Sequence, residues 1–270
     1  MLETEKRNPR TTHIDTADTL TMLRLINDEN YRSVRAVEAA LSSIADAVDA
    51  VADAFAKGGR LIYVGAGTSG RIASADAAEC PPTYGVDPGQ VITIIAGGES
   101  ALTRASENAE DKSDAGIRDL LAVDVKPCDV VMGISASGGA EYVASALAKA
   151  KELGCVTISL SSNSPCKIAE IADLNIFTDT GAEVITGSTR MKAGNAQKMV
   201  LNMITTCAMV KTGKVYENLM INLKPTNRKL KHRMVTIVAD ILSCDENEAE
   251  ARLNESDWNI RAAVGRPAAE

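Results

Sequence analysis

The sequence predicts an α/β protein built on a doubly wound, mainly parallel sheet, with helices before and after it. Five short apolar runs rich in Val and Ile occupy the middle of the chain, at residues 61–64, 91–95, 130–134, 156–160 and 174–177. Helical patterns lie between most of these runs, for example over residues 141–153. Continuous apolar strands that alternate with helices are typical of a parallel sheet covered on both faces.

Two helices are expected before the first strand. Apolar residues recur three and four positions apart between residues 18 and 57, and the pattern stops at Gly58 and Gly59. Such spacing puts the apolar side chains on one helical face, and paired glycines end a helix. We therefore expect residues 1–57 to form a helical segment that packs on the core.

The pattern becomes helical again after Gly187. Helices are expected over three ranges, residues 190–212, 226–242 and 246–253. The last six residues read as a frayed tail. These patterns predict a central domain at residues 58–225 and a small helical module at residues 226–270.

Composition favours a protein that acts on small molecules in the cytoplasm. The net charge of −7 and the aromatic content of 3% argue against a nucleic-acid partner. No uncharged apolar run approaches the roughly 18 residues of a membrane span, and the charged start of the chain does not resemble a signal peptide. The six cysteines are scattered without a C-x-x-C pair, so we expect reduced thiols and no metal site.

The loop after the first predicted strand reads GAGTSGR, residues 65–71. Its glycines let the backbone approach an anion, and the hydroxyls of Thr68 and Ser69 can donate to it. The start of the following helix adds free N–H groups and the positive end of the helix dipole. The same letters also fit the G-x-G-x-x-G pattern of dinucleotide sites, so both kinds of phosphate ligand remain open at this point.

A second loop of this kind follows the third predicted strand and reads GISASGG, residues 133–139. One serine-rich turn is typical of a helix cap, whereas two at the carboxyl ends of strands in one sheet can converge on one ligand. A dinucleotide fold also needs an acidic residue after the second strand to hold the ribose, and here that strand ends in IAGG, residues 95–98. The pattern therefore favours a monophosphorylated sugar over a nicotinamide cofactor.

Two acidic stretches follow these loops. Glu79 lies in AECPPTYG, at the end of the helix that begins in the first loop, where a solvated carboxylate is the simplest interpretation. Glu107 and Glu110 lie in ENAED after the second strand, and on a helix their spacing would put them on one face. Two carboxylates near a bound sugar phosphate suit general acid and base catalysis, with one ionised and one protonated.

Five stretches together resemble the N-acetylmuramic acid 6-phosphate etherases, which belong to the sugar isomerase (SIS) class: GAGTSGR, AECPPTYG, ENAED, GAEVITGSTRMKAG with QKMVLNM, and GKVYENLM. The resemblance runs from Thr4 to about Asn259. It implies a SIS-type sugar-phosphate-binding domain at residues 58–225, a homodimer, and hydrolytic removal of D-lactate from the C3 ether of N-acetylmuramic acid 6-phosphate. The product is N-acetylglucosamine 6-phosphate, the setting is peptidoglycan recycling, and no metal or organic cofactor is required.

The resemblance also implies roles for individual residues. Glu110 would be the base that removes the C2 proton of the open-chain sugar, and Glu79 the acid that protonates the departing lactyl oxygen. The implied binders of phosphate and sugar hydroxyls are Thr68, Ser69, Ser135 and Ser137, with the N–H groups of Gly67 and Gly70, and with Glu107 on the sugar hydroxyls. Arg190 and Lys192 would belong to an element that closes the site or the dimer.

The chain departs from the family pattern at several positions. Gly139 and Ala140 stand where the family usually has Arg and Thr, and a lost hydrogen bond to a charged group is worth about 1.5–3 kcal/mol. Asn195 replaces a Thr, and the C-terminus is shorter than usual. These changes favour a non-catalytic sugar-phosphate regulator like the glucokinase regulatory protein, and a SIS-type isomerase is a further alternative. Retention of both Glu79 and Glu110 argues more strongly for a carbon–oxygen lyase.

Overall fold

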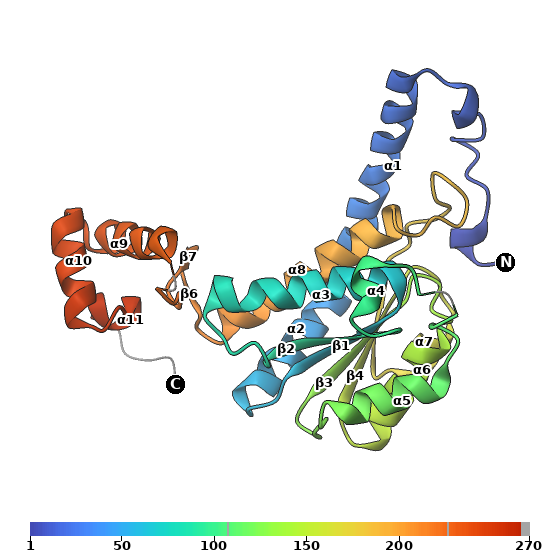
Figure 1. Cartoon of the computed structure of the whole chain (residues 1–270). Coiled ribbons are helices and arrows are strands. Elements are labelled where there is room, and N and C mark those ends of the chain that lie inside the picture. The colour runs from blue at the N-terminus through green and yellow to red at the C-terminus, as the bar shows by residue number, and fades with distance from the viewer. Residues whose placement is uncertain (107, 226, 266–270) are drawn as a thin grey trace.

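A computed structural model describes residues 1–106, 108–225 and 227–265. Within these residues the central sheet has five parallel strands in the order β2-β1-β3-β4-β5, as Figure 1 shows. The strands are β1 (Leu61–Gly65), β2 (Val91–Ile95), β3 (Val130–Ile134), β4 (Val156–Ser161) and β5 (Leu174–Phe177). Each predicted apolar run is a strand, so the predicted doubly wound parallel sheet is confirmed.

The strand order creates a switch point between β1 and β3. The chain forms β2 on one side of β1 and then crosses to the other side for β3, β4 and β5. The connections that follow β1 and β3 therefore run in opposite directions, which leaves a crevice at the carboxyl ends of these two strands. Open α/β sheets of this order bind their ligands at that position.

Helices cover both faces of the sheet because successive strand residues point to opposite faces. Leu61, Tyr63 and Met132 belong to the apolar cluster on one face, while Ile62 and Val131 belong to the other. The first face carries α2 (Leu41–Ala56), α3 (Gly67–Tyr84) and α8 (Lys192–Lys211), and the second carries α5 (Ser113–Ala122), α6 (Glu141–Glu152) and α7 (Lys167–Ile171). The sheet is thus buried on both sides, as its Val- and Ile-rich strands require.

The N-terminal segment is helical but only partly packed on the core. Helix α1 (Thr19–Ala39) projects beyond the sheet, and the residues before it fold back toward the body in two short 3-10 helices, η1 (Glu3–Glu5) and η2 (Ile14–Thr16) (Figure 1). The Asp18 side chain accepts a hydrogen bond from the Thr21 N–H at 3.0 Å, which caps the start of α1.

The connection after β2 differs from the helical pattern considered for its acidic residues. A short helix, α4 (Ser100–Thr103), follows β2, and residues 108–111 form a turn, with Asn108 at a φ of 60°. The shared helical face considered for Glu107 and Glu110 is therefore not available to Glu110, and Glu107 lies outside the described residues.

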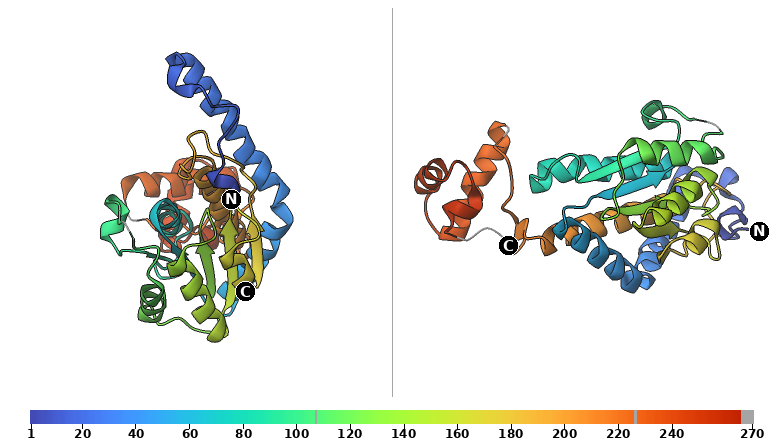
Figure 2. Two further views of the ribbon diagram at one scale, coloured as in Figure 1. Left: turned by 90° about the vertical axis from the view of Figure 1, so that its right-hand side faces the viewer. Right: turned by 90° about the horizontal axis from the view of Figure 1, so that it is seen from below.

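The C-terminal residues form a small unit beside the sheet domain, as Figures 1 and 2 show. A hairpin of β6 (Val215–Tyr216) and β7 (Leu219–Met220) leads into α9 (Arg228–Leu242), α10 (Glu246–Glu255) and α11 (Ile260–Ala263). These elements surround an apolar cluster of their own, which includes Met234, Val238 and Leu253. Asn222 ties the unit to the end of α3 by donating to the Tyr84 carbonyl at 2.5 Å. No helix in the described parts of the chain is long and apolar enough to span a membrane.

Candidate functional site

The two serine-containing loops lie side by side at the switch point. Gly65, the last residue of β1, pairs in register with Ile134, the last residue of β3. The residues that follow them, 66–69 and 135–137, line one cavity of about 330 Å³ together with Glu110. The parallel pairing of β1 and β3 therefore places both loops on one prospective ligand.

Glycines in the first loop allow the turn to pack closely. A Cβ on Gly65 would lie 2.7 Å from the Gly70 nitrogen, and a Cβ on Gly70 would lie 2.5 Å from the Ile95 side chain. Helix α3 then begins at Gly67 without a side-chain cap from any described residue. The N–H groups of an uncapped first turn lack partners within the helix, and such groups are suited to an anionic ligand.

The sequence-derived binders in this loop divide into two groups. Gly67, Thr68 and Ser69 line the cavity, with Thr68 half-buried and Ser69 buried. Gly70 lies behind them, because its N–H donates to the Ala66 carbonyl at 3.4 Å and its Cα packs against Ile95. The contribution of Gly70 is close packing of the loop rather than a free N–H donor.

The hydroxyls of the second loop already accept backbone hydrogen bonds. Ser135 Oγ accepts from the Gly138 N–H at 3.1 Å, and Ser137 Oγ accepts from the Gly139 N–H at 3.2 Å. The two hydroxyl oxygens lie 3.3 Å apart. One of these hydroxyls donates to the other, so the hydrogen of the second hydroxyl remains for donation to an anionic ligand. Ala140, which precedes α6, also lines the cavity and presents a methyl group there.

Glu110 is positioned at the cavity by its backbone. Its carbonyl accepts the Tyr142 N–H at 2.9 Å, which fixes this turn against the first turn of α6. Glu110 lines the main cavity and also an adjoining cavity of about 260 Å³ that Thr68 and Arg71 share. The Arg71 guanidinium donates to the carbonyls of Ala101 and Arg104 at 2.8 and 2.9 Å, so it supports the adjacent loop.

Glu79 lies far from this cavity within one copy of the chain. It is exposed and follows Gly67 by twelve residues on α3, a separation of about 18 Å along a helix axis. Among the described residues that line the two cavities, Glu110 is included and Glu79 is not. The structure therefore does not bring Glu79 and Glu110 together in a single subunit.

A buried polar cluster around Asp76 anchors α3 to the first strand and to α8. Asp76 accepts hydrogen bonds from Tyr63 at 2.9 Å, Asn202 at 2.5 Å and Thr205 at 3.2 Å. Burial raises the pKa of Asp76 although these three bonds oppose the shift. Glu79, three residues later on the same helix, lies about 60° around the helix axis from Asp76 and is exposed.

Three cavity residues had no chemical role in the sequence-based interpretation: Glu5, Gly187 and Thr189. Glu5 comes from the N-terminal segment, and the other two come from the loop that precedes α8. Glu5 belongs to TEKRNP, and Gly187 and Thr189 belong to GSTRMKAG, two stretches that resemble the etherase family. Nothing in the local pattern of either stretch predicts that it faces the same cavity as the serine loops.

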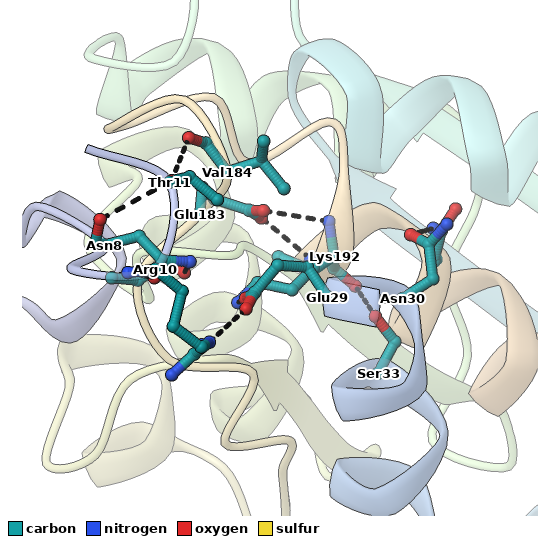
Figure 3. Close-up of polar contacts among 12 residues, drawn as sticks. Asn8, Arg10, Thr11, Glu29, Asn30, Ser33, Glu183, Val184 and Lys192 are labelled. Carbon is teal, nitrogen blue, oxygen red and sulfur yellow. Dashed lines mark hydrogen bonds and ion pairs between the residues drawn. The ribbon is translucent and has the colours of Figure 1, made fainter. Parts of the chain in front are cut away.

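A buried ionic network holds these two segments in place (Figure 3). Lys192 is completely buried, and its ammonium pairs with the Glu29 carboxylate at 2.5 Å. Arg10 pairs with the other oxygen of the same carboxylate at 2.5 Å. Burial by itself would raise the pKa of Glu29, but hydrogen bonds from Arg10 and Lys192 outweigh it and lower the pKa to about 2. Lys192 thus joins α8 to α1 rather than reaching the cavity.

Glu183 shapes the loop that carries Gly187 and Thr189. Its carboxylate accepts the N–H groups of Lys192 and Ala193, each at 3.0 Å, and so satisfies the start of α8. Burial raises the pKa of Glu183, while these bonds act in the opposite direction.

Two residues singled out in the sequence near the start of α8 do not line the cavity. Arg190 is exposed. Asn195 donates to Asn30 of α1 at 3.2 Å, so its departure from the family pattern lies outside the cavity lining.

Metal-ligand side chains do not gather at the site. In the ranges 1–106, 108–225 and 227–265, no group of three or more His, Cys, Asp and Glu side chains is arranged to hold a metal ion. The polar groups at the cavity are hydroxyls, backbone N–H groups and carboxylates, and these suit a phosphorylated, hydroxyl-bearing ligand.

Comparison with known proteins places this chain in a family. Residues 43–151 match the family model of the glucokinase regulatory protein N-terminal SIS domain. Over 97% of its length the chain is 50% identical to N-acetylmuramic acid 6-phosphate etherase 2 of Vibrio parahaemolyticus, covering 88% of that protein. It is 51% identical, again over 97% of its length, to the N-acetylmuramic acid 6-phosphate etherase of Caldanaerobacter subterraneus, covering 86% of that protein.

Solved structures agree on the fold. A phosphosugar isomerase-like protein of Bacteroides fragilis has a TM-score of 0.56 at 21% identity, covering 73% of this chain and 94% of that one. An Escherichia coli CFT073 protein, solved as a ligand complex, has a TM-score of 0.55 at 19% identity, covering 75% of this chain and 97% of that one. These structures show the fold, and the sequence identities of 50% and 51% over 97% of the chain show the family: the chain belongs to the N-acetylmuramic acid 6-phosphate etherases.

Proposed function

We propose that this chain is an N-acetylmuramic acid 6-phosphate etherase, a carbon–oxygen lyase of amino-sugar and peptidoglycan recycling. The observation that carries the proposal is the switch-point cavity, which combines an uncapped helix start, serine and threonine hydroxyls and the carboxylate of Glu110 in a chain of this family. The hydroxyls of Thr68, Ser69, Ser135 and Ser137 and the first-turn N–H groups of α3 bind the 6-phosphate. The product is N-acetylglucosamine 6-phosphate, and D-lactate leaves.

The proposed reaction is an elimination followed by addition of water. Glu110 removes the C2 proton of the open-chain sugar, which is acidic because C1 is an aldehyde, and the electron pair forms an enolate. The enolate expels the C3 lactyl oxygen, which takes a proton from the catalytic acid, and a C2–C3 double bond results. Water then adds to C3 and a proton returns to C2, so the net change is hydrolysis of one ether bond.

We further propose a homodimer in which Glu79 serves the cavity of the other subunit as the acid. The separation of about 18 Å between Glu79 and the start of α3 supports this arrangement, since one copy cannot supply both carboxylates to one cavity. Helix α1 also projects with several large apolar side chains exposed, and such a surface is typical of an interface. These side chains are Leu20, Leu23, Tyr31 and Val34.

The activity is tested by incubating the purified chain with N-acetylmuramic acid 6-phosphate and measuring D-lactate with a coupled dehydrogenase. We expect lactate to be released, and Glu110→Gln to abolish both release and exchange of the C2 proton with solvent deuterium. Glu79→Gln should slow ether cleavage more than C2 exchange. Absence of lactate, combined with thermal stabilisation by the sugar phosphate, would instead support a non-catalytic regulator.

Hybrid dimers test the shared site. We expect Glu79→Gln and Glu110→Gln subunits to be nearly inactive alone. A mixed dimer would contain one cavity with an intact Glu110 and an intact Glu79 from its partner. We expect activity to reappear after the two variants are unfolded, mixed and refolded together. If the two carboxylates acted in one subunit, mixing would restore nothing.

The alternatives are less well supported. The glucokinase regulatory protein SIS model matches residues 43–151 alone, whereas the etherase relatives match 97% of the chain.

We also propose a cytoplasmic location and three units, residues 1–57, 58–225 and 226–270. The separate apolar cluster around α9, α10 and α11 supports the third unit, and residues from 216 onward also contribute to it.

A further inference from the structure

The N-terminal residues 4–11, here called the strap, contribute Glu5 to the lining of the switch-point cavity. We propose that Glu5 in this strap determines substrate specificity by accepting a hydrogen bond from a hydroxyl of the bound sugar. The identity of the ligand rests on the function proposed above, whereas the position of Glu5 rests on contacts of the strap itself.

One anchor ties the strap to the second serine loop. Thr4 is fully buried. Its N–H donates to Asn163 Oδ1 at 3.4 Å, and its hydroxyl oxygen accepts from Asn163 Nδ2 at 3.0 Å. The Asn163 amide also donates to the Ala136 carbonyl at 2.9 Å, between Ser135 and Ser137. The residue directly before Glu5 is therefore held by the same loop that presents the cavity hydroxyls.

A second anchor follows Glu5 and ties the strap to the loop before α8. The Asn8 amide donates to the Ala182 carbonyl at 3.2 Å, and the Thr11 hydroxyl donates to the Val184 carbonyl at 2.8 Å. Arg10 adds its ion pair with the buried Glu29 (Figure 3). Because both flanks are bound through buried polar groups, the backbone of Glu5 has little freedom to move away from the cavity.

The Glu5 carboxylate is available to a ligand. It lines the cavity with Thr68 and Thr189, and a Cβ built on Gly187 would lie 3.0 Å from its Oε2 atom. Among the described residues it has no hydrogen-bond or ion-pair partner, although Glu3 on the same 3-10 helix pairs with Lys6. Gly187 has a φ of 75°, so a glycine there both permits the turn and leaves room for the carboxylate.

The chemistry of Glu5 complements that of the rest of the cavity. The hydroxyls and N–H groups are donors suited to phosphate, whereas an ionised carboxylate only accepts hydrogen bonds and repels a phosphate. A sugar phosphate can satisfy both, with its phosphate on the donors and a hydroxyl on Glu5. Inorganic phosphate has no sugar hydroxyl to place on Glu5, so charge repulsion dominates its interaction with this carboxylate. The carboxylate therefore selects for the hydroxylated sugar by attraction and against bare anions by repulsion.

Calorimetric titration with two ligands tests this role without requiring turnover. For Glu5→Ala we expect affinity for N-acetylglucosamine 6-phosphate to fall by about 10- to 100-fold, the loss of a hydrogen bond to a charged group. Glu5→Gln keeps an acceptor oxygen and should lose less. Inorganic phosphate should bind both variants at least as tightly as the unmodified chain. Glu3→Ala, on the same 3-10 helix and exposed, is the matched control and should bind both ligands normally.

Two outcomes would overturn the inference. One is an unchanged affinity of Glu5→Ala for the sugar phosphate, and the other is an equal loss for both ligands, which would indicate a displaced loop. Unfolding curves that match those of the unmodified chain confirm that the variants are folded. A chain that releases no lactate but shows the expected ligand difference would contradict the etherase function and leave the role of Glu5 intact.

Discussion

Replacing Glu29 by Gln is expected to destabilise the chain by about 3–5 kcal/mol, because it leaves the Lys192 ammonium buried without its counter-ion. The side chain of Lys192 is completely buried and that of Glu29 is 3% exposed, so water cannot take over the lost interaction. The pKa of Glu29 provides a second route to the magnitude. A decrease from the ordinary 4.5 to about 2 corresponds to about 3 kcal/mol of stabilisation at neutral pH.

Urea unfolding followed by circular dichroism measures this change, since urea leaves ion pairs unscreened. The protein concentration is kept constant so that association does not shift the midpoint. Asp49→Asn is the matched control, because the Lys211–Asp49 pair is also a direct contact, at 2.7 Å, but both of its side chains are exposed. We expect that exposed pair to contribute less than about 1 kcal/mol.

The double variant Glu29→Gln with Lys192→Met separates an unpaired charge from lost packing. Removing both charges should cost less than Glu29→Gln alone, since an apolar replacement of a buried pair leaves no uncompensated ion. The reasoning is refuted if Glu29→Gln changes the free energy of unfolding no more than Asp49→Asn does. It is also refuted if the double variant is less stable than Glu29→Gln alone.

Further predictions concern pH, the departure at Ala140, the first loop and the cap of α8. Because the pKa of Glu29 is lowered in the folded chain, its stabilisation is complete above about pH 4.5 and is lost as the pH falls toward 2, so urea midpoints of the unmodified chain and Glu29→Gln should converge over that range. Ala140→Thr places a hydroxyl at the cavity wall and should tighten sugar-phosphate binding roughly 10-fold in calorimetry; unchanged binding would show that this position does not contact the ligand. Gly70→Ala brings a methyl group to 2.5 Å from Ile95 and should cost about 1–3 kcal/mol and weaken binding. Gly98→Ala has no atom within 4 Å of the new Cβ but a φ of 68°, so it should lower stability through backbone strain and leave binding unchanged. Glu183→Gln keeps one acceptor but loses its charge at the start of α8, and a melting temperature equal to that of the unmodified chain would contradict its capping role.

Much of the fold follows from local pattern. The strands appear where Val and Ile are continuous, and α1 and α2 appear where apolar residues recur at helical spacing, because both signals depend on neighbours within a few positions. The short elements escape prediction for the same reason: the hairpin of β6 and β7 and the four-residue helix α11 are too brief to produce a period. Residues 108–111 carry no strong pattern, and they form a turn.

Local sequence is enough to predict the parallel sheet and the two glycine- and hydroxyl-rich loops at its switch point, since a turn of that composition between a strand and a helix is recognisable from neighbouring residues alone. Packing between distant elements determines which other residues reach those loops. Lys192, expected near the site or the dimer, pairs instead with Glu29, and Glu5 enters the cavity from the far end of the chain. Glu79 remains on the outer end of α3, apart from Glu110. Contacts between residues more than a hundred positions apart depend on how whole elements pack, and no local period or composition carries that information.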